Sequence, residues 1–83
     1  MPYDLEIQEF VDGMQKKLAM NTHKQTVEKK DVPKIVQLLL GEVMEFEEQY
    51  KEDKSDANAY DELFDIANYA FLMYMALKKE NKP

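Results

Sequence analysis

The sequence contains no cysteine among its 83 residues. Disulfide bonds and thiolate metal sites are therefore excluded as sources of stability, and nothing in the composition indicates an oxidising compartment. A chain of this length buries only about 60–65% of the surface that its unfolded form exposes, so a core built from one copy is marginal. Self-association is the remaining source of stability, and we expect a homodimer or a homotetramer.

Long apolar runs and a basic leader are also missing. The most apolar stretch, residues 62–77, is too short and too interrupted by polar side chains to span a bilayer, and the first residues do not resemble a secretory signal. We expect a cytoplasmic protein that does not bind a membrane. A net charge of −6 argues against a protein that coats a nucleic acid polymer, because neutralising phosphates requires a basic surface.

Positive and negative charge lie in different parts of the chain. Six of the eleven lysines and His23 lie between Lys16 and Lys34, whereas acidic residues gather between residues 42 and 65. A basic and an acidic segment on one small body can hold a polyphosphate and its counter-metal. Two solvated helix faces would give the same pattern, so both interpretations stay open at this point.

Apolar residues recur at helical spacing in three segments and predict an all-α fold. The first helix is predicted over about residues 4–20, followed by a polar loop or irregular helix end over 21–31. Pro33 fits the first turn of a second helix, in which apolar side chains recur at a 3-4-3-4 spacing: Val36, Leu39, Val43, Phe46 and Tyr50. A polar turn then leads to a third helix over about 58–79.

We expect residues 1–83 to form one domain, an antiparallel helical hairpin plus an N-terminal helix. The second helix is apolar on more sides than one neighbour can cover. The hairpin is therefore predicted to assemble into an oligomeric core of the four-helix-bundle type.

Acidic pairs at helical spacing mark the second and third helices. Glu42 and Glu45 are three residues apart on one, and Glu62 and Asp65 are three apart on the other. If the helices pack antiparallel, all four carboxylates can face one patch and hold a hard cation, Mg²⁺ or Mn²⁺. Asn68 continues the strip. The alternative is that Glu62, Asp65 and Asn68 form the solvated side of a buried helix.

Two segments resemble the all-α nucleoside triphosphate pyrophosphohydrolases of the MazG-like superfamily. The signature of that superfamily is EExxE, a spacer, then ExxD, and it resembles GEVMEF with Glu42 and Glu45, followed by DELFDIANYA with Glu62 and Asp65. The upstream MQKKLAMNTHK is similar to a segment of short phage and bacterial members. The resemblance covers about residues 10–78. Gly41 stands where the first glutamate of EExxE usually does, and Val27 stands near a frequent tryptophan, which leaves substrate choice open.

The resemblance implies hydrolysis of a nucleoside triphosphate between its α- and β-phosphates, giving the monophosphate and pyrophosphate. The metal ligands it implies are Glu42, Glu45, Glu62 and Asp65, and we take Glu45 as the carboxylate that activates water. Residues expected to contact the substrate are Asn21, His23, Lys24 and Asn68. Lys17 and Lys34 are further candidates for contact with its phosphates.

Two other functions remain open. One is an enzyme like the phosphoribosyl-ATP pyrophosphatase of histidine synthesis, which shares the helical architecture and the acid pattern; the NTHK segment at residues 21–24 favours the MazG-like side. The other is a non-catalytic helical oligomer that binds a protein partner through the apolar face of its third helix. In that case the acids are surface charge.

Overall fold

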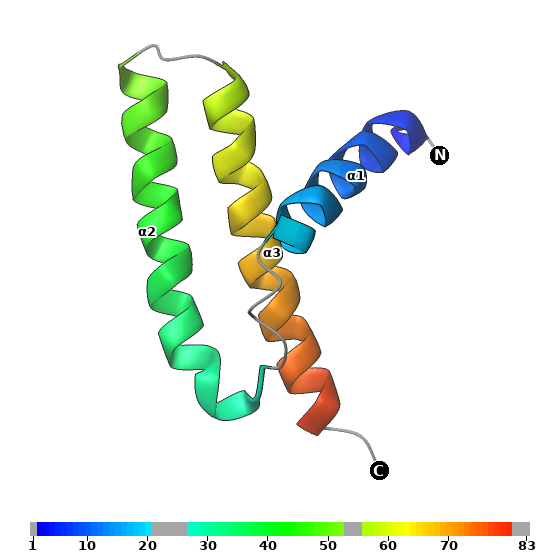
Figure 1. Cartoon of the computed structure of the whole chain (residues 1–83), viewed down its shortest axis with the longest axis vertical. Coiled ribbons are helices and arrows are strands. Elements are labelled where there is room, and N and C mark those ends of the chain that lie inside the picture. Colours follow the sequence, from blue (N-terminus) through cyan, green and yellow to red (C-terminus); the bar gives the residue numbers. More distant parts are fainter. Residues whose placement is uncertain (1, 21–26, 53–55, 81–83) are drawn as a thin grey trace.

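A computed structural model describes residues 2–20, 27–52 and 56–80 of the chain, and within these ranges the fold is all-α (Figure 1). The elements are α1 (Asp4–Met20), a 3₁₀ helix η1 (Lys29–Asp31), α2 (Val32–Lys51) and α3 (Asp56–Glu80). The predicted fold class is confirmed. The third helix begins two residues earlier than the sequence indicated.

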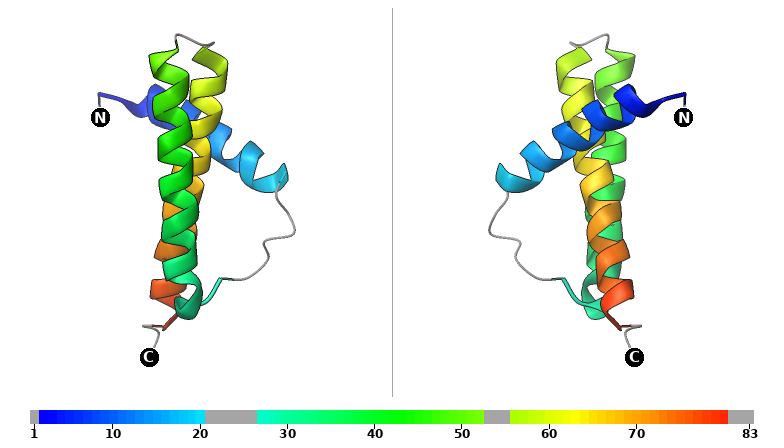
Figure 2. Two further views of the ribbon diagram at one scale, coloured as in Figure 1. Left: turned by 90° about the vertical axis from the view of Figure 1, so that its left-hand side faces the viewer. Right: turned by 90° about the vertical axis from the view of Figure 1, so that its right-hand side faces the viewer.

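Helices α2 and α3 run antiparallel and lie side by side along their length, which gives the predicted hairpin (Figures 1 and 2). The entry to α2 is fixed by local hydrogen bonds. The backbone N–H of Glu28 donates to Oδ2 of Asp31 over 3.0 Å, and the N–H of Asp31 donates to the carbonyl of Glu28 over 2.9 Å. Pro33 then lies in the first turn, where its missing N–H leaves no hydrogen bond unmade.

Helix α1 crosses α3 and, among the described residues, does not contact α2. Gly13 lies at the crossing, where a Cβ would overlap the ring of Phe64. The rings of Phe10 and Phe64 lie 5.4 Å apart at a tilt of 57°, a geometry that aromatic pairs favour. From the sequence, Gly13 only weakens the helix. The structure shows that its missing side chain lets α1 approach α3.

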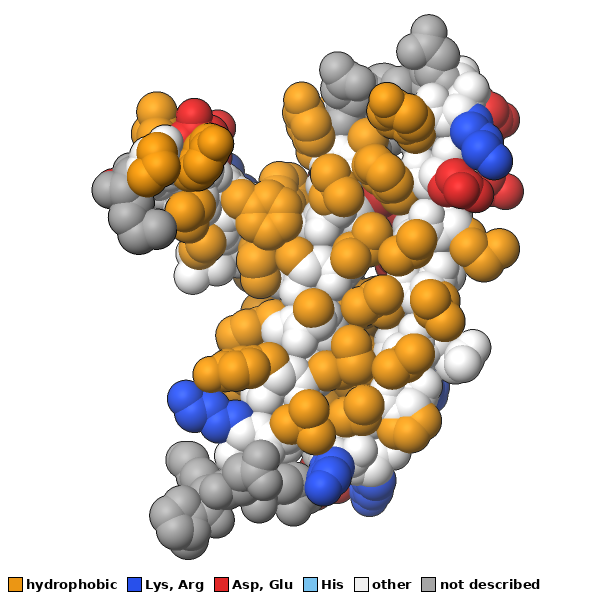
Figure 3. Space-filling model, turned by 180° about the vertical axis from the view of Figure 1, so that it is seen from behind, with side chains coloured by type: hydrophobic (Ala, Val, Ile, Leu, Met, Phe, Trp, Pro, Cys, Tyr) orange, Lys and Arg blue, Asp and Glu red, His pale blue; other side chains and the backbone are white. Residues whose placement is uncertain are grey.

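The core of a single copy is thin. Among the described residues, the buried apolar ones are Ile35 and Ala76, while Val36, Leu40, Met44, Tyr60, Phe71 and Tyr74 are among the exposed ones. Figure 3 shows apolar side chains spread over one face of the hairpin and over α1. One chain is described, and the assembly into a four-helix bundle stays a prediction.

None of the described helices is long and apolar enough to cross a membrane.

Candidate metal centre

Three carboxylates converge between the two helices of the hairpin. Glu42 of α2 and Glu62 and Asp65 of α3 each place one oxygen within 4.8 Å of the other two. All three residues are half-buried. Such a spacing allows one small cation to contact three carboxylate oxygens at once.

The helices supply this convergence by their spacing and direction. Residues three apart on a helix lie on the same side of it, so Glu62 and Asp65 share one side of α3. The antiparallel packing of α2 against α3 sets Glu42 opposite them. The interpretation of Glu62 and Asp65 as part of a solvated strip is therefore not what the described geometry shows.

The close approach of like charges changes the acidity of the cluster. The pKa of Glu62 is raised from 4.5 to about 7, first because its protonated carboxyl hydrogen-bonds Glu42 and next because burial disfavours its charge. Contact with Glu45 acts in the opposite direction, and the charges of Glu42 and Asp65 raise the pKa further. At neutral pH the cluster therefore retains a proton part of the time.

Glu45 lies against Glu62 but is exposed and does not belong to the group of three converging oxygens. Its pKa is also raised, mainly by the hydrogen bond and the charge of Glu62 and then by burial. The four predicted metal ligands thus separate into a compact set of three and a neighbouring carboxylate that is more accessible to water.

The cluster contains oxygens that need a positive partner. With the carboxylates ionised, Oε2 of Glu42 and Oε2 of Glu62 are buried without a hydrogen-bond donor among the described residues. A buried acceptor without a donor costs about 1–3 kcal/mol, and more if it is charged. A proton or a cation can remove this cost. Since every atom that could ligate a metal in this set is a carboxylate oxygen, the residues fit a hard divalent cation better than a soft one.

A lysine of α1 already supplies part of that positive charge. Nζ of Lys17 lies 3.5 Å from Oδ2 of Asp65, and both side chains are about four-fifths buried, with 23% and 21% of their surface exposed. From the sequence, Lys17 is only a further candidate for contact with the substrate's phosphates. Its pairing with Asp65 depends on where α1 crosses α3, which the sequence pattern does not give.

Asn68 joins α1 to the same side of α3. It is 6% exposed, and its Nδ2 donates a hydrogen bond of 3.0 Å to the backbone carbonyl of Met14, while its Oδ1 has no partner in the described part of the chain. The predicted role of Asn68 in substrate binding is not tested by this contact. The strip from Glu62 to Asn68 faces α2 at one end and α1 at the other.

Gln49 is a residue to which the sequence assigned no role. Its Oε1 is buried and has no partner among the described residues. Gln49 follows Glu42 and Glu45 on one track of α2, and this spacing was the signal that could have drawn attention to it.

Three predicted substrate contacts, Asn21, His23 and Lys24, lie outside the described residues. Lys34 is exposed in the first turn of α2. Gly41, where the MazG-like signature usually has its first glutamate, faces open space, since a Cβ there would meet nothing within 4 Å. A side chain would therefore fit at this position.

Comparison of the chain with models of protein families, with curated proteins and with solved structures gives no match. The likeness to the MazG-like superfamily accordingly rests on the residues quoted from the sequence and is not supported by these comparisons.

Proposed function

We propose that the chain is a Mg²⁺-dependent nucleoside triphosphate pyrophosphohydrolase that converts a nucleoside or deoxynucleoside triphosphate to the monophosphate and pyrophosphate. The observation that carries this proposal is the convergence of Glu42, Glu62 and Asp65 within 4.8 Å. The MazG-like resemblance suggests the reaction, and the acid cluster suggests the cation that such a reaction requires. Nucleoside triphosphates are available in the cytoplasm, where we propose that the protein acts.

Glu42, Glu62 and Asp65 would hold Mg²⁺, or Mn²⁺ in its place, with Glu45 as an additional ligand. When bound, the cation would neutralise charge on the triphosphate and lower the pKa of a coordinated water. The residues support this role because two buried oxygens of the cluster lack a donor and the pKa of Glu62 is raised to about 7. A cation would satisfy both oxygens and favour the ionised form of Glu62.

Glu45 is the best placed carboxylate to accept a proton from water. It is exposed, contacts Glu62, and its raised pKa brings its basicity closer to neutral pH than that of an ordinary glutamate. Water would attack the α-phosphorus and pyrophosphate would leave. Substrate contacts remain proposed for Asn21, His23 and Lys24 on the basic segment and for Asn68.

The test is an assay of the full chain with Mg²⁺ and each common nucleoside triphosphate, with pyrophosphate and monophosphate as measured products. We expect Glu62→Gln and Asp65→Asn each to lower kcat at least about 100-fold, because each removes a cluster carboxylate. Glu48→Gln is the matched control, since Glu48 is an exposed acid on α2. Absence of product with every nucleotide, while far-UV circular dichroism shows a folded chain, contradicts the proposal.

A metal titration tests the cation site separately from turnover. Binding of Mn²⁺, followed by electron paramagnetic resonance, is expected to weaken at least about tenfold in Glu62→Gln and to stay unchanged in Glu48→Gln. Tight Mn²⁺ binding without turnover would support the cation site and contradict the proposed pyrophosphohydrolase activity.

A non-catalytic helical oligomer that binds a protein partner is the second candidate. The observation that favours it is the extent of exposed apolar surface on α2 and α3. This candidate predicts no product in the assay and the same thermal stability with and without Mg²⁺. A phosphoribosyl-ATP substrate is tested in the same assay by adding that compound to the panel.

A further inference from the structure

Helix α3 has a third side that is largely exposed, although α1 covers part of it where the ring of Phe64 lies against Gly13 and Phe10. Tyr60, Phe64, Ala67, Phe71, Tyr74 and Lys78 follow one another at spacings of 4-3-4-3-4 residues, which places them on one stripe of a helix. Tyr60, Phe71 and Tyr74 are 57%, 38% and 59% exposed. Phe64 and Ala67 between them are half-buried. An exposed group of large aromatic residues on one side of a helix indicates a surface that another protein covers.

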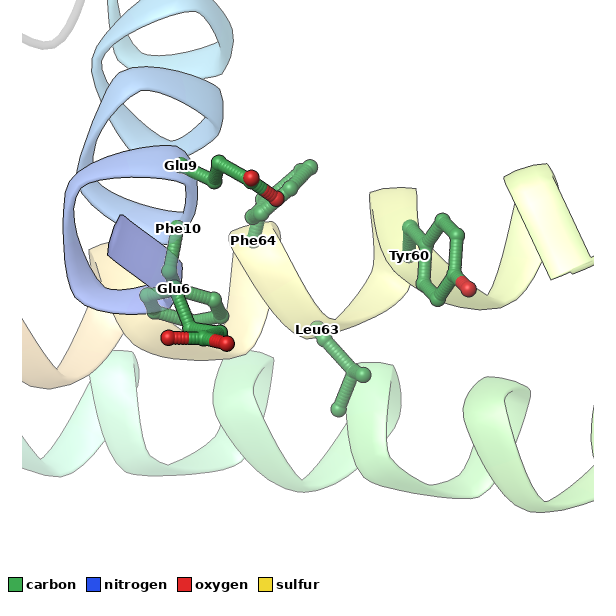
Figure 4. A pocket seen from close by; sticks show the side chains of 6 residues that line it. All are labelled: Glu6, Glu9, Phe10, Tyr60, Leu63 and Phe64. Atoms are coloured by element: carbon green, nitrogen blue, oxygen red, sulfur yellow. The ribbon is translucent and has the colours of Figure 1, made fainter. Parts of the chain in front are cut away.

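The first half of this stripe forms the floor of a groove beside α1. The groove has a volume of about 420 Å³ and is lined by Tyr60, Leu63 and Phe64 of α3 and by Glu6, Glu9 and Phe10 of α1. Figure 4 shows the aromatic side chains of both helices with the two glutamates at α1. The second half of the stripe has the opposite charge, because it ends at Lys78, beside Lys79. Nζ of Lys78 lies 5.7 Å from the centre of the Tyr74 ring.

The two halves of the stripe are related by a reversal about Ala67. Phe64 and Phe71 flank Ala67 at three and four residues, and Tyr60 and Tyr74 follow at seven on each side. If two copies of α3 pack antiparallel with Ala67 facing Ala67, each Tyr60 lies near the partner's Tyr74 and each Phe64 near the partner's Phe71. The small side chain of Ala67 allows the helix axes to come close at the centre.

The exposed area of the chain as a whole is large enough to leave room for such a partner. The chain exposes 6645 Å², whereas a folded monomer of 9.8 kDa is expected to expose roughly 5,200 Å². The difference, roughly 1,500 Å², exceeds the roughly 800 Å² per partner that a stable complex buries. The radius of gyration of 14.2 Å is likewise larger than the roughly 12 Å expected for a compact domain of this length.

We infer that a second copy of this chain covers the third side of α3, in a two-fold dimer whose axis passes next to Ala67. The acidic groove of each copy receives the end of α3 of the other, so that Glu6 and Glu9 face Lys78 and Lys79 of the partner. A two-fold interface is self-complementary, and the reversal of both shape and charge along the stripe provides this complementarity. The dimer contact is distinct from the acid cluster and does not depend on the proposed reaction.

A single cysteine tests the position of the axis, because the natural chain has none. Under mild oxidation Ala67→Cys is expected to form a disulfide-linked dimer, since residues at a two-fold axis face their own copies. Ala70→Cys is the control: it is exposed on the same helix one turn away and lies off the stripe. Equal dimer yields from the two variants, or none from Ala67→Cys, overturn the assignment.

Sedimentation of the full chain tests the charges. Wild type is expected to be dimeric at about 0.1 mM, and Glu9→Lys and Lys78→Glu each to weaken the dimer about tenfold or more. The double variant Glu9→Lys with Lys78→Glu is expected to recover most of that loss. Glu48→Lys is the control for a change of net charge. A monomeric wild type, or a double variant as weak as the singles, overturns the proposal.

A charged residue placed in the stripe tests its apolar contacts. Tyr74→Glu is expected to make the chain monomeric, whereas Leu77→Glu, on an exposed residue of the same turn that lies off the stripe, is expected to leave it dimeric. Far-UV circular dichroism establishes that both variants are helical. Monomer formation by both variants contradicts the stripe as the interface.

Discussion

Lys17 of α1 and Asp65 of α3 form an ion pair with 3.5 Å between Nζ and Oδ2, at the edge of a cluster that already contains two glutamates. The pair ties the N-terminal helix to the candidate metal centre. It also offsets negative charge that the cluster would otherwise carry alone.

Lys17→Met is therefore expected to destabilise the fold at pH 8 in the absence of divalent cations. The loss should be about 1 kcal/mol, since the pair is only partly exposed, and would lower the Tm by about 4–8 °C in a domain of this size. Lys16→Met is the matched control, because Lys16 is an exposed neighbour on the same helix. Thermal unfolding measures the Tm of both variants. Equal losses would show that the ion pair with Asp65 does not contribute to stability.

Stability is expected to fall as pH rises from about 4.5 to 7. The pKa of Glu62 is about 7 in the folded chain and 4.5 without the surrounding groups, so the folded state binds more protons than the unfolded state in this range. Protonated Glu62 therefore favours folding below about pH 4.5, and this contribution is lost as the pH passes 7. Its size is on the order of 2 kcal/mol, less than the full shift would give, because solvent screens the charges around a half-buried carboxyl.

Denaturant unfolding at several pH values measures this dependence. Glu62→Gln should flatten it, because a neutral amide cannot titrate. Mg²⁺ added at pH 8 should restore stability in wild type and not in Glu62→Gln. A wild-type profile that is already flat between pH 4.5 and 7 contradicts the raised pKa.

Two glycine substitutions on α1 and α2 are expected to have opposite signs. Gly13→Ala places a methyl group in the ring of Phe64 and should destabilise by about 1–3 kcal/mol. Gly41→Ala meets open space and should stabilise by about 0.5–1 kcal/mol through better helix propensity. Chemical unfolding of both variants decides the matter; a stabilised Gly13→Ala would mean that α1 does not cross α3 at this position.

Asn68→Ala is expected to loosen α1 more than the hairpin. The substitution removes the donor to the Met14 carbonyl and should cost about 1–2 kcal/mol. Hydrogen exchange resolved along the chain measures this, with faster exchange expected in α1 than in α2. Gln37→Ala on an exposed position of α2 is the control.

Local pattern was sufficient to predict the helices. The first helix was expected over about 4–20 and lies at Asp4–Met20, and Pro33 correctly indicated the start of α2. The third helix extends beyond its predicted bounds, from Asp56 to Glu80. Helix-terminal residues are where local signals are weakest.

The proximity of Glu42, Glu62 and Asp65 was one of two arrangements that the spacing allowed, because the same side of the third helix could also have faced water. The contacts made by α1 did not follow from spacing. They depend on where α1 crosses α3, which is set by the missing side chain at Gly13 and the ring of Phe64. The periodicity of apolar residues within α1 does not show which turn of α3 the helix contacts. The functional roles of the acids and of Asn68 stay predictions.

The attachment of α1 through one crossing has a consequence for the acid cluster. Without a contact to α2 in the described chain, α1 is attached to the hairpin through its crossing of α3. Any change that weakens this crossing would therefore also separate Lys17 from Asp65 and leave the acid cluster with less positive charge beside it.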